Sequence, residues 1–217
     1  MAQVMAPMDH EVQSVAQLGD QARSLYTNIV AGSEGNSATS AEGIRNEISS
    51  LISELQANWK GPDAAVQINN LVEVFNSLGD IGTALGEYSR VATNEAIHYN
   101  EIQIAHGAQG KAIDPVSPVA LEHRARLEDN SDQVSIRAEI ANTTQKFDTL
   151  KQHLTSFKSN VANSADALFK NWSAGEGYST AKTAIDDLDA NIGKFLSVVD
   201  QAVESINTAV SNYGSRQ

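Results

Sequence analysis

Histidines, carboxylates and cysteines carry most protein chemistry, and in this chain their spacing does not build a reactive site. The 217 residues include no cysteine, so there is no thiolate ligand, nucleophile or disulfide. No two of the five histidines are three or four positions apart, the spacing that a metal pair on one helix requires. They are His10, His98, His106, His123 and His153.

The carboxylates also lack the pattern of a catalytic or metal site. They cluster at Asp186, Asp187 and Asp189 and at Glu128, Asp129 and Asp132, with no paired counterpart, which is typical of solvated helix faces. There is no phosphate-binding loop, dinucleotide fingerprint, nucleophile elbow or zinc-protease motif. We therefore predict a protein that is not an enzyme, with no catalytic residue, cofactor or metal.

Net charge narrows the class of partner. Asp and Glu number 27 against 15 Lys and Arg, giving a net charge of −12. This sign disfavours nucleic acid and anionic membranes as partners. The first residues lack the basic and apolar regions of a signal peptide, and no apolar stretch approaches the ~18 residues of a membrane span. We expect any export to proceed without a cleaved signal.

Two similar corners hold both tryptophans of the chain. NWKG contains Trp59 and Gly61, and NWSAG contains Trp172 and Gly175. A tyrosine follows each tryptophan at nearly the same distance, 40 positions to Tyr99 and 41 to Tyr213. This correspondence predicts two diverged copies of one unit. In each, the aromatic ring would close a helical hairpin and the glycine would permit the reversal, with docking on a partner as an added role.

Hydrophobic periodicity predicts the helices that position these corners. Steps alternating between four and three residues run on both sides of Trp172, and a similar pattern flanks Trp59. The seam before Trp172 is Ile136, Ile140, Thr143, Phe147, Leu150, Leu154, Phe157, Val161, Ser164 and Leu168. The seam after it is Tyr178, Ala181, Ile185, Leu188, Ile192, Phe195, Val199, Ala202, Ile206, Ala209 and Tyr213.

The predicted fold is all-α. Two long hairpins with Trp-Gly turns would pack antiparallel as an elongated four-helix bundle, with an extra helix over residues 9–30. The first hairpin covers 1–105, a linker 106–130 and the second hairpin 131–217. Residues 119–128 of the linker could be helical. Thr39 with Glu42 could cap the helix that begins near Ile44. Both tryptophans should lie at reversals, outside strands and helix interiors.

Three glycines share one side of the helix that follows Trp59. Gly79, Gly82 and Gly86 each cost up to ~1 kcal/mol relative to alanine in a helix. They would allow a close helix crossing, or they are tolerated flexibility in a long helix.

These features together resemble the WXG family, the early-secretory-antigen-like helical hairpins exported by bacterial type VII secretion systems. Trp59-Lys60-Gly61 matches its motif literally, and the second corner has one inserted residue. Family members usually pair as antiparallel hairpin dimers, so the chain resembles two protomers fused in tandem. The resemblance covers most of the chain, least securely residues 1–43 and 106–130.

The resemblance also implies an export signal, a tyrosine followed four positions later by an acidic residue and recognised together with the Trp-Gly corner. Here Tyr99 is followed by Gln103 and Tyr213 by Gln217. The tyrosines match the family pattern and the acidic residues are replaced by glutamine.

The resemblance predicts a secreted protein, cytoplasmic before export, that acts by protein–protein contacts as a substrate, co-substrate or effector. Its partners would be the secretion ATPase and another secreted protein or toxin; the chain would be an intramolecular pseudo-dimer, with a homo-oligomer left open. Two alternatives are a cytoplasmic chaperone or adaptor for a toxin's helical leader and a membrane-perturbing effector.

Overall fold

The computed structural model describes residues 14–32, 37–128, 134–172 and 176–214, most of them helical. Residues 14–24 form a helix that continues as the π-helix η1 (Leu25–Ala31), so the predicted N-terminal helix is present from residue 14; residues 9–13 lie outside the described residues. The remaining elements are η2 (Ser37–Thr39), α2 (Ala41–Asn58), β1 (Trp59–Lys60), α3 (Pro62–Ala105), β2 (Ser135–Ile136), η3 (Ala138–Asn142), α4 (Thr143–Asn171) and α5 (Glu176–Gly214).

A capping serine begins α2, and a proline in the first turn begins α3. Ser40 caps α2, its hydroxyl accepting a hydrogen bond from the Gly43 amide at 3.0 Å, so the capping residue is one position after the predicted Thr39. Pro62 starts α3, where its missing N–H costs nothing, and Asp63 complements the helix dipole. At 44 residues, α3 is about 66 Å long.

Helices α4 and α5 bury the predicted seams. Phe147, Leu150, Leu154, Phe157 and Val161 are buried along α4, as are Ala181, Leu188, Ile192, Phe195, Val199, Ala202 and Ile206 along α5. The third long helix starts later than the sequence indicated. Residues 135–136 form β2, residues 138–142 form η3, and α4 begins only at Thr143.

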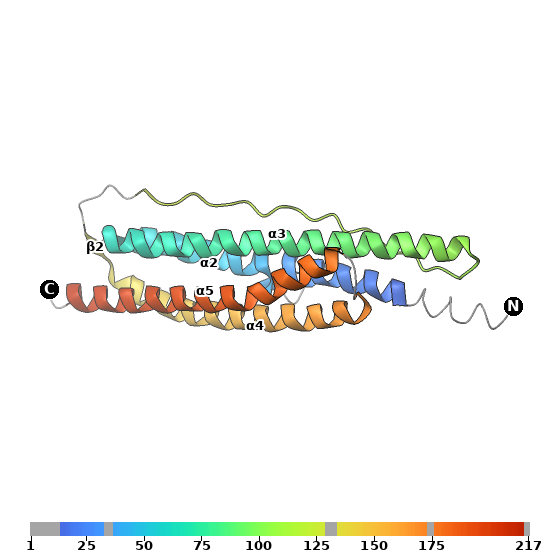
Figure 1. The fold of residues 1–217 in the computed structure, drawn as a ribbon. Helices are drawn as coiled ribbons and strands as arrows, with labels where there is room; N and C mark the ends of the chain where they lie inside the picture. The colour runs from blue at the N-terminus through green and yellow to red at the C-terminus, as the bar shows by residue number, and fades with distance from the viewer. Residues whose placement is uncertain (1–13, 33–36, 129–133, 173–175, 215–217) are drawn as a thin grey trace.

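The long helices lie side by side as a helical bundle (Figure 1). Helix α2 packs on α3 and α4, and α5 packs on α3 and α4. Helices α3 and α5 run antiparallel, since Val66 shares a recess with Thr208, and Leu85 shares another with Leu188. One apolar cluster extends through all four of these helices and the N-terminal helical segment.

The described part of the linker contains no helix after His106, so the helix considered for Val119–Glu128 is wrong. The chain turns at the end of α3 and runs back along it in an extended conformation (Figure 1, yellow-green). Ser117 precedes Pro118, and a residue before proline is restricted to extended geometry.

A two-stranded pairing that the sequence analysis did not predict joins the two Trp-containing units. In this antiparallel ladder Trp59 pairs with Ile136 and Lys60 with Ser135. Trp59 does lie at the reversal between α2 and α3, but the expectation that it would stay outside a strand is wrong for this two-residue segment.

Candidate functional site

The Trp59 corner is a tight reversal between α2 and α3. Trp59 is 3% exposed, and the Asn58 carbonyl beside it accepts a hydrogen bond from the Arg137 amide at 2.9 Å. Gly61 has φ +117° and ψ 176°, a conformation that essentially only glycine adopts. A Cβ at Gly61 would also lie 3.1 Å from Val134 Cγ2. The glycine is therefore required by backbone geometry and by close packing.

A recess of about 680 Å³ opens beside this corner and joins it to the end of α5. Its lining includes Trp59, Gly61 and Val66 from the first unit, and Thr208 and Asn212 from α5. Val66 is an exposed apolar side chain at 54%. The recess thus combines a Trp-Gly corner from one unit with a helix end from the other.

The Trp172 corner has a different environment. Trp172 is 4% exposed and forms an aromatic cluster with Phe169 and Tyr178, the ring centroids lying 5.2 to 6.4 Å apart. Beside it, Asn171 Nδ2 donates to Gln21 Oε1 at 2.9 Å. The N-terminal helical segment therefore packs next to this corner, whereas the Trp59 corner lies beside α5.

The structure places the two predicted export tyrosines in different positions relative to the Trp59 corner. Tyr99, 55% exposed, and Gln103 lie near the end of α3, about 55 Å along the helix from its Trp59 corner. The start of α5 lies beside Tyr88, so α3 extends beyond it for several turns. Tyr213 belongs to the last turn of α5, next to Asn212 of the recess. Gly175 and Gln217 lie outside the described residues.

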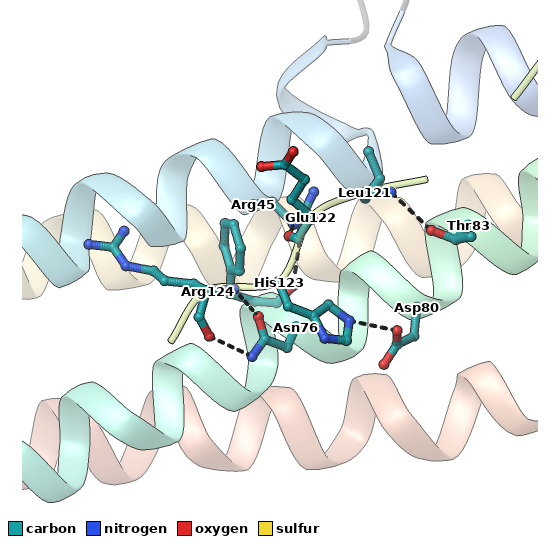
Figure 2. Close-up of polar contacts among 9 residues, drawn as sticks. Arg45, Asn76, Asp80, Thr83, Leu121, Glu122, His123 and Arg124 are labelled. Carbon is teal, nitrogen blue, oxygen red and sulfur yellow. Dashed lines mark hydrogen bonds and ion pairs between the residues drawn. The ribbon is translucent and has the colours of Figure 1, made fainter. Parts of the chain in front are cut away.

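An extensive polar site lies along α3, where the chain segment 118–127, here named the strap, is held by its main chain. Asn69 Nδ2 donates to the Leu127 carbonyl at 3.1 Å, and the Leu127 amide donates to Asn69 Oδ1 at 2.7 Å. Asn76 makes the same pair of bonds with Arg124, at 3.0 and 2.7 Å. The Leu121 amide donates to Thr83 Oγ1 at 3.1 Å. Figure 2 shows the second and third of these steps.

The hydrogen bonds from Asn69, Asn76 and Thr83 to the strap are here named the ladder, and their regular spacing has a geometric cause. Asn69, Asn76 and Thr83 are spaced by seven residues, which is about 10.5 Å along a helix. Their partners are spaced by three residues, which covers about 9–10 Å in an extended chain. The two repeats match closely enough for one side chain every two helical turns to bind every third residue of the strap.

Burial along the strap has the same period. Pro118, Leu121, Arg124 and Leu127 are half-buried, and each pair of residues between them is exposed. A period of three is typical of a polyproline-II-like conformation, which has three residues per turn. The strap therefore presents one side to α3 and two sides to solvent.

Arg45 of α2 also holds the middle of the strap. Its Nη2 donates to the Glu122 carbonyl (Figure 2), and its Nε donates to the Phe75 carbonyl at 3.2 Å. The guanidinium lies 4.1 Å from the centroid of the Phe75 ring. Burial lowers the pKa of Arg45, an effect that nearby Glu42, Asp80 and Glu122 oppose, and arginine stays charged at any ordinary pH.

The glycine stripe of α3 makes room for these contacts. A Cβ at Gly82 would lie 2.7 Å from Leu121 Cδ1, and one at Gly86 would lie 2.8 Å from Pro118 Cβ. A Cβ at Gly79 would meet the Arg45 guanidinium at 3.4 Å. The expected close helix approach is present at Gly82, where an added Cβ would also lie 3.3 Å from Ala41 Cβ of α2, and the shortest contacts at the three glycines are made by the strap and by Arg45.

Ionic contacts between α3 and the strap are complementary. Asp80 pairs with His123 at 2.8 Å and Glu73 pairs with Arg126 at 3.0 Å, both exposed. Across the described ranges, no group of three or more histidines and carboxylates could hold a metal ion. Within the same ranges, no helix is both long and apolar enough to cross a membrane.

Sequence reasoning missed the ladder, although its signal is visible in the sequence. Asn69 and Asn76 are helix-disfavouring residues seven positions apart on one face of a long helix, with Thr83 a further seven away. A comparison of the chain with known family models, curated proteins and solved structures finds no match.

Proposed function

We propose that this chain is a non-enzymatic helical protein that acts by protein–protein contacts, a tandem WXG-type substrate or co-substrate of a type VII secretion system. In this proposal α2–α3 and α4–α5 are two copies of one hairpin, packed antiparallel as an elongated four-helix bundle. The antiparallel course of α3 and α5 and the shared apolar cluster support that arrangement.

The observation that carries the proposal is the recess beside Trp59. Its walls bring a Trp-Gly corner together with the end of the other unit's second helix, where Tyr213 follows Asn212. These are the two parts that the family resemblance implies are recognised jointly. The exposed Val66 offers an apolar contact to a partner.

The proposal also distinguishes the two ends of the molecule. The Trp172 corner packs beside the N-terminal segment, and α3 carries Tyr99 well beyond the start of α5. We therefore expect the secretion machinery to bind the Trp59 end, with the Trp172 corner serving packing alone.

Export from the native host tests this function. An epitope-tagged chain should be found in the medium of the parent strain, and deletion of the system's membrane ATPase should remove it from the medium while leaving it in cells. Equal amounts in both media would refute the proposal. Retention in the cells of both strains, with a toxin co-purifying, would favour the chaperone or adaptor alternative.

Matched surface variants test which end is recognised. Val66→Asp places a charge in the recess and should reduce export strongly, whereas Ile102→Asp, an equivalent exposed apolar position at the far end of α3, should leave it unchanged. Circular dichroism of both purified variants controls for folding. Equal export of the two would argue against the Trp59 end as the recognition site.

A further inference from the structure

The side chains of the ladder on α3 bind the strap almost entirely through the main chain of the strap. Asn69, Asn76 and Thr83 make five hydrogen bonds to strap amides and carbonyls, and Arg45 adds one to the Glu122 carbonyl. Main-chain groups are the same in every polypeptide, so this recognition constrains conformation much more than sequence.

Side-chain requirements are confined to the inward positions. Pro118 packs against Gly86, and the end of the Leu121 side chain packs against Gly82. Arg124 Nη1 donates a hydrogen bond to Ser49 Oγ at 2.7 Å. The outward positions project into solvent, where Asp80 and Glu73 of α3 pair with His123 and Arg126. An acidic rim, in a chain of net charge −12, favours basic ligands.

We propose that this face of α3, with Arg45 of α2, is a binding site for an extended basic peptide segment of a partner protein, and that the strap occupies it in cis. The ligand has proline, leucine or arginine at inward positions spaced by three, and Lys, Arg or His among the outward positions. This inference goes beyond the proposed export function and depends only on contacts of α2 and α3.

The tethered strap competes with any such partner. A segment attached at both ends is held near its site at an effective concentration of about millimolar, so a free peptide binds the wild-type chain weakly. Displacement of the strap opens the site.

A labelled peptide with the sequence of residues 117–128 tests the site by fluorescence anisotropy on the full-length chain. In Leu121→Asp/Leu127→Asp, the two carboxylates oppose seating of the chain's own strap but leave α2 and α3 unchanged. We expect this variant to bind the peptide at least about tenfold more tightly than the wild type does. Ala125→Asp, at an exposed strap position, should behave as the wild type.

Pro118→Asp provides a second way to displace the strap, because a carboxylate replaces the ring that packs against Gly86 while the site on α2 and α3 is unchanged. It should also increase peptide affinity. Adding Asn76→Leu to either displaced variant removes two hydrogen bonds and should lower the affinity about tenfold or more.

Two further peptides test whether this face of α3 can bind other polypeptides or binds only the chain's own strap. N-methylation at the positions of Leu121, Arg124 and Leu127 removes the amide donors and should abolish binding. A peptide that keeps only those three residues and Pro118, with Lys, Ser and Gln at the outward positions, should still bind. Failure of this second peptide to bind, unchanged binding after N-methylation, or displaced variants no better than wild type would each overturn the proposal.

Discussion

At the residue scale, two glycines show how position decides the effect of the same side chain. Gly61 has a positive φ and lies against Val134, whereas a Cβ at Gly193 in the middle of α5 would meet nothing within 4 Å. Gly79 is 20 positions after Trp59 and Gly193 is 21 positions after Trp172, so the predicted repeat would pair them, yet a Cβ at Gly79 would lie 3.4 Å from the Arg45 guanidinium. Two glycines at corresponding distances from a tryptophan therefore have different surroundings.

We predict that Gly61→Ala destabilises the protein by about 1–3 kcal/mol, because alanine is strained in this backbone conformation. The matched control Gly193→Ala should stabilise it by up to ~1 kcal/mol, since helix propensity improves without a clash. Urea unfolding followed by circular dichroism measures both. A Gly61→Ala chain as stable as the wild type would mean that the reversal at Trp59 can relax.

The residues of the corner could be singled out from the sequence, and those of the ladder were not. A tryptophan next to a glycine between two apolar seams indicates a reversal by itself. The hydrogen-bonding role of Asn69 and Asn76 depends on an extended segment, some 50 residues later in the chain, that packs on them. Arg45 is a similar case, since nothing in its local sequence indicates that a buried cation will contact the Glu122 carbonyl.

At the element scale, the helices follow from local patterns and the strap does not. The heptad seams of α4 and α5 predicted which residues are buried, because the apolar stripe of an amphipathic helix faces the core. The strap has no period of its own that a single sequence reveals. Its conformation is imposed by the seven-residue spacing of partners on α3, which is tertiary information.

The ladder predicts an unusual pattern of hydrogen exchange. In the native protein the amides of Leu121, Arg124 and Leu127 should be protected, because each donates to a side chain of α3. The amides of the exposed residues between them should exchange much faster. Exchange followed by NMR measures this pattern.

Asn76→Leu should abolish the protection of Arg124 and reduce that of its two neighbours in the ladder. Uniform protection of residues 119–127 would indicate a regular hydrogen-bonded element instead, and uniformly fast exchange would indicate that the strap is not seated in solution.

At the scale of the whole molecule, one apolar core links both Trp-containing units. Trp59, Trp172 and the buried faces of α2, α3, α4 and α5 belong to the same cluster. A shared core of this kind favours a single cooperative unfolding transition, although the sequence suggests two repeats.

Single-tryptophan variants test this cooperativity. Trp172→Phe leaves Trp59 as the sole indole reporter, and Trp59→Phe leaves Trp172. In each variant the fluorescence transition in urea should coincide with the loss of helical circular dichroism. A fluorescence midpoint that differs from the helical midpoint within one variant would show that the two units unfold separately.

The strap also sets an order of events during synthesis. Every contact described for it is made with residues that precede it in the chain, from Arg45 and Ser49 to Asn76 and Thr83. As the polypeptide leaves the ribosome, the first unit can bind this segment before α4 and α5 exist. The emerging second half is then delivered to the Trp59 end of α3, where β2 pairs with β1. Translation itself would select the antiparallel assembly.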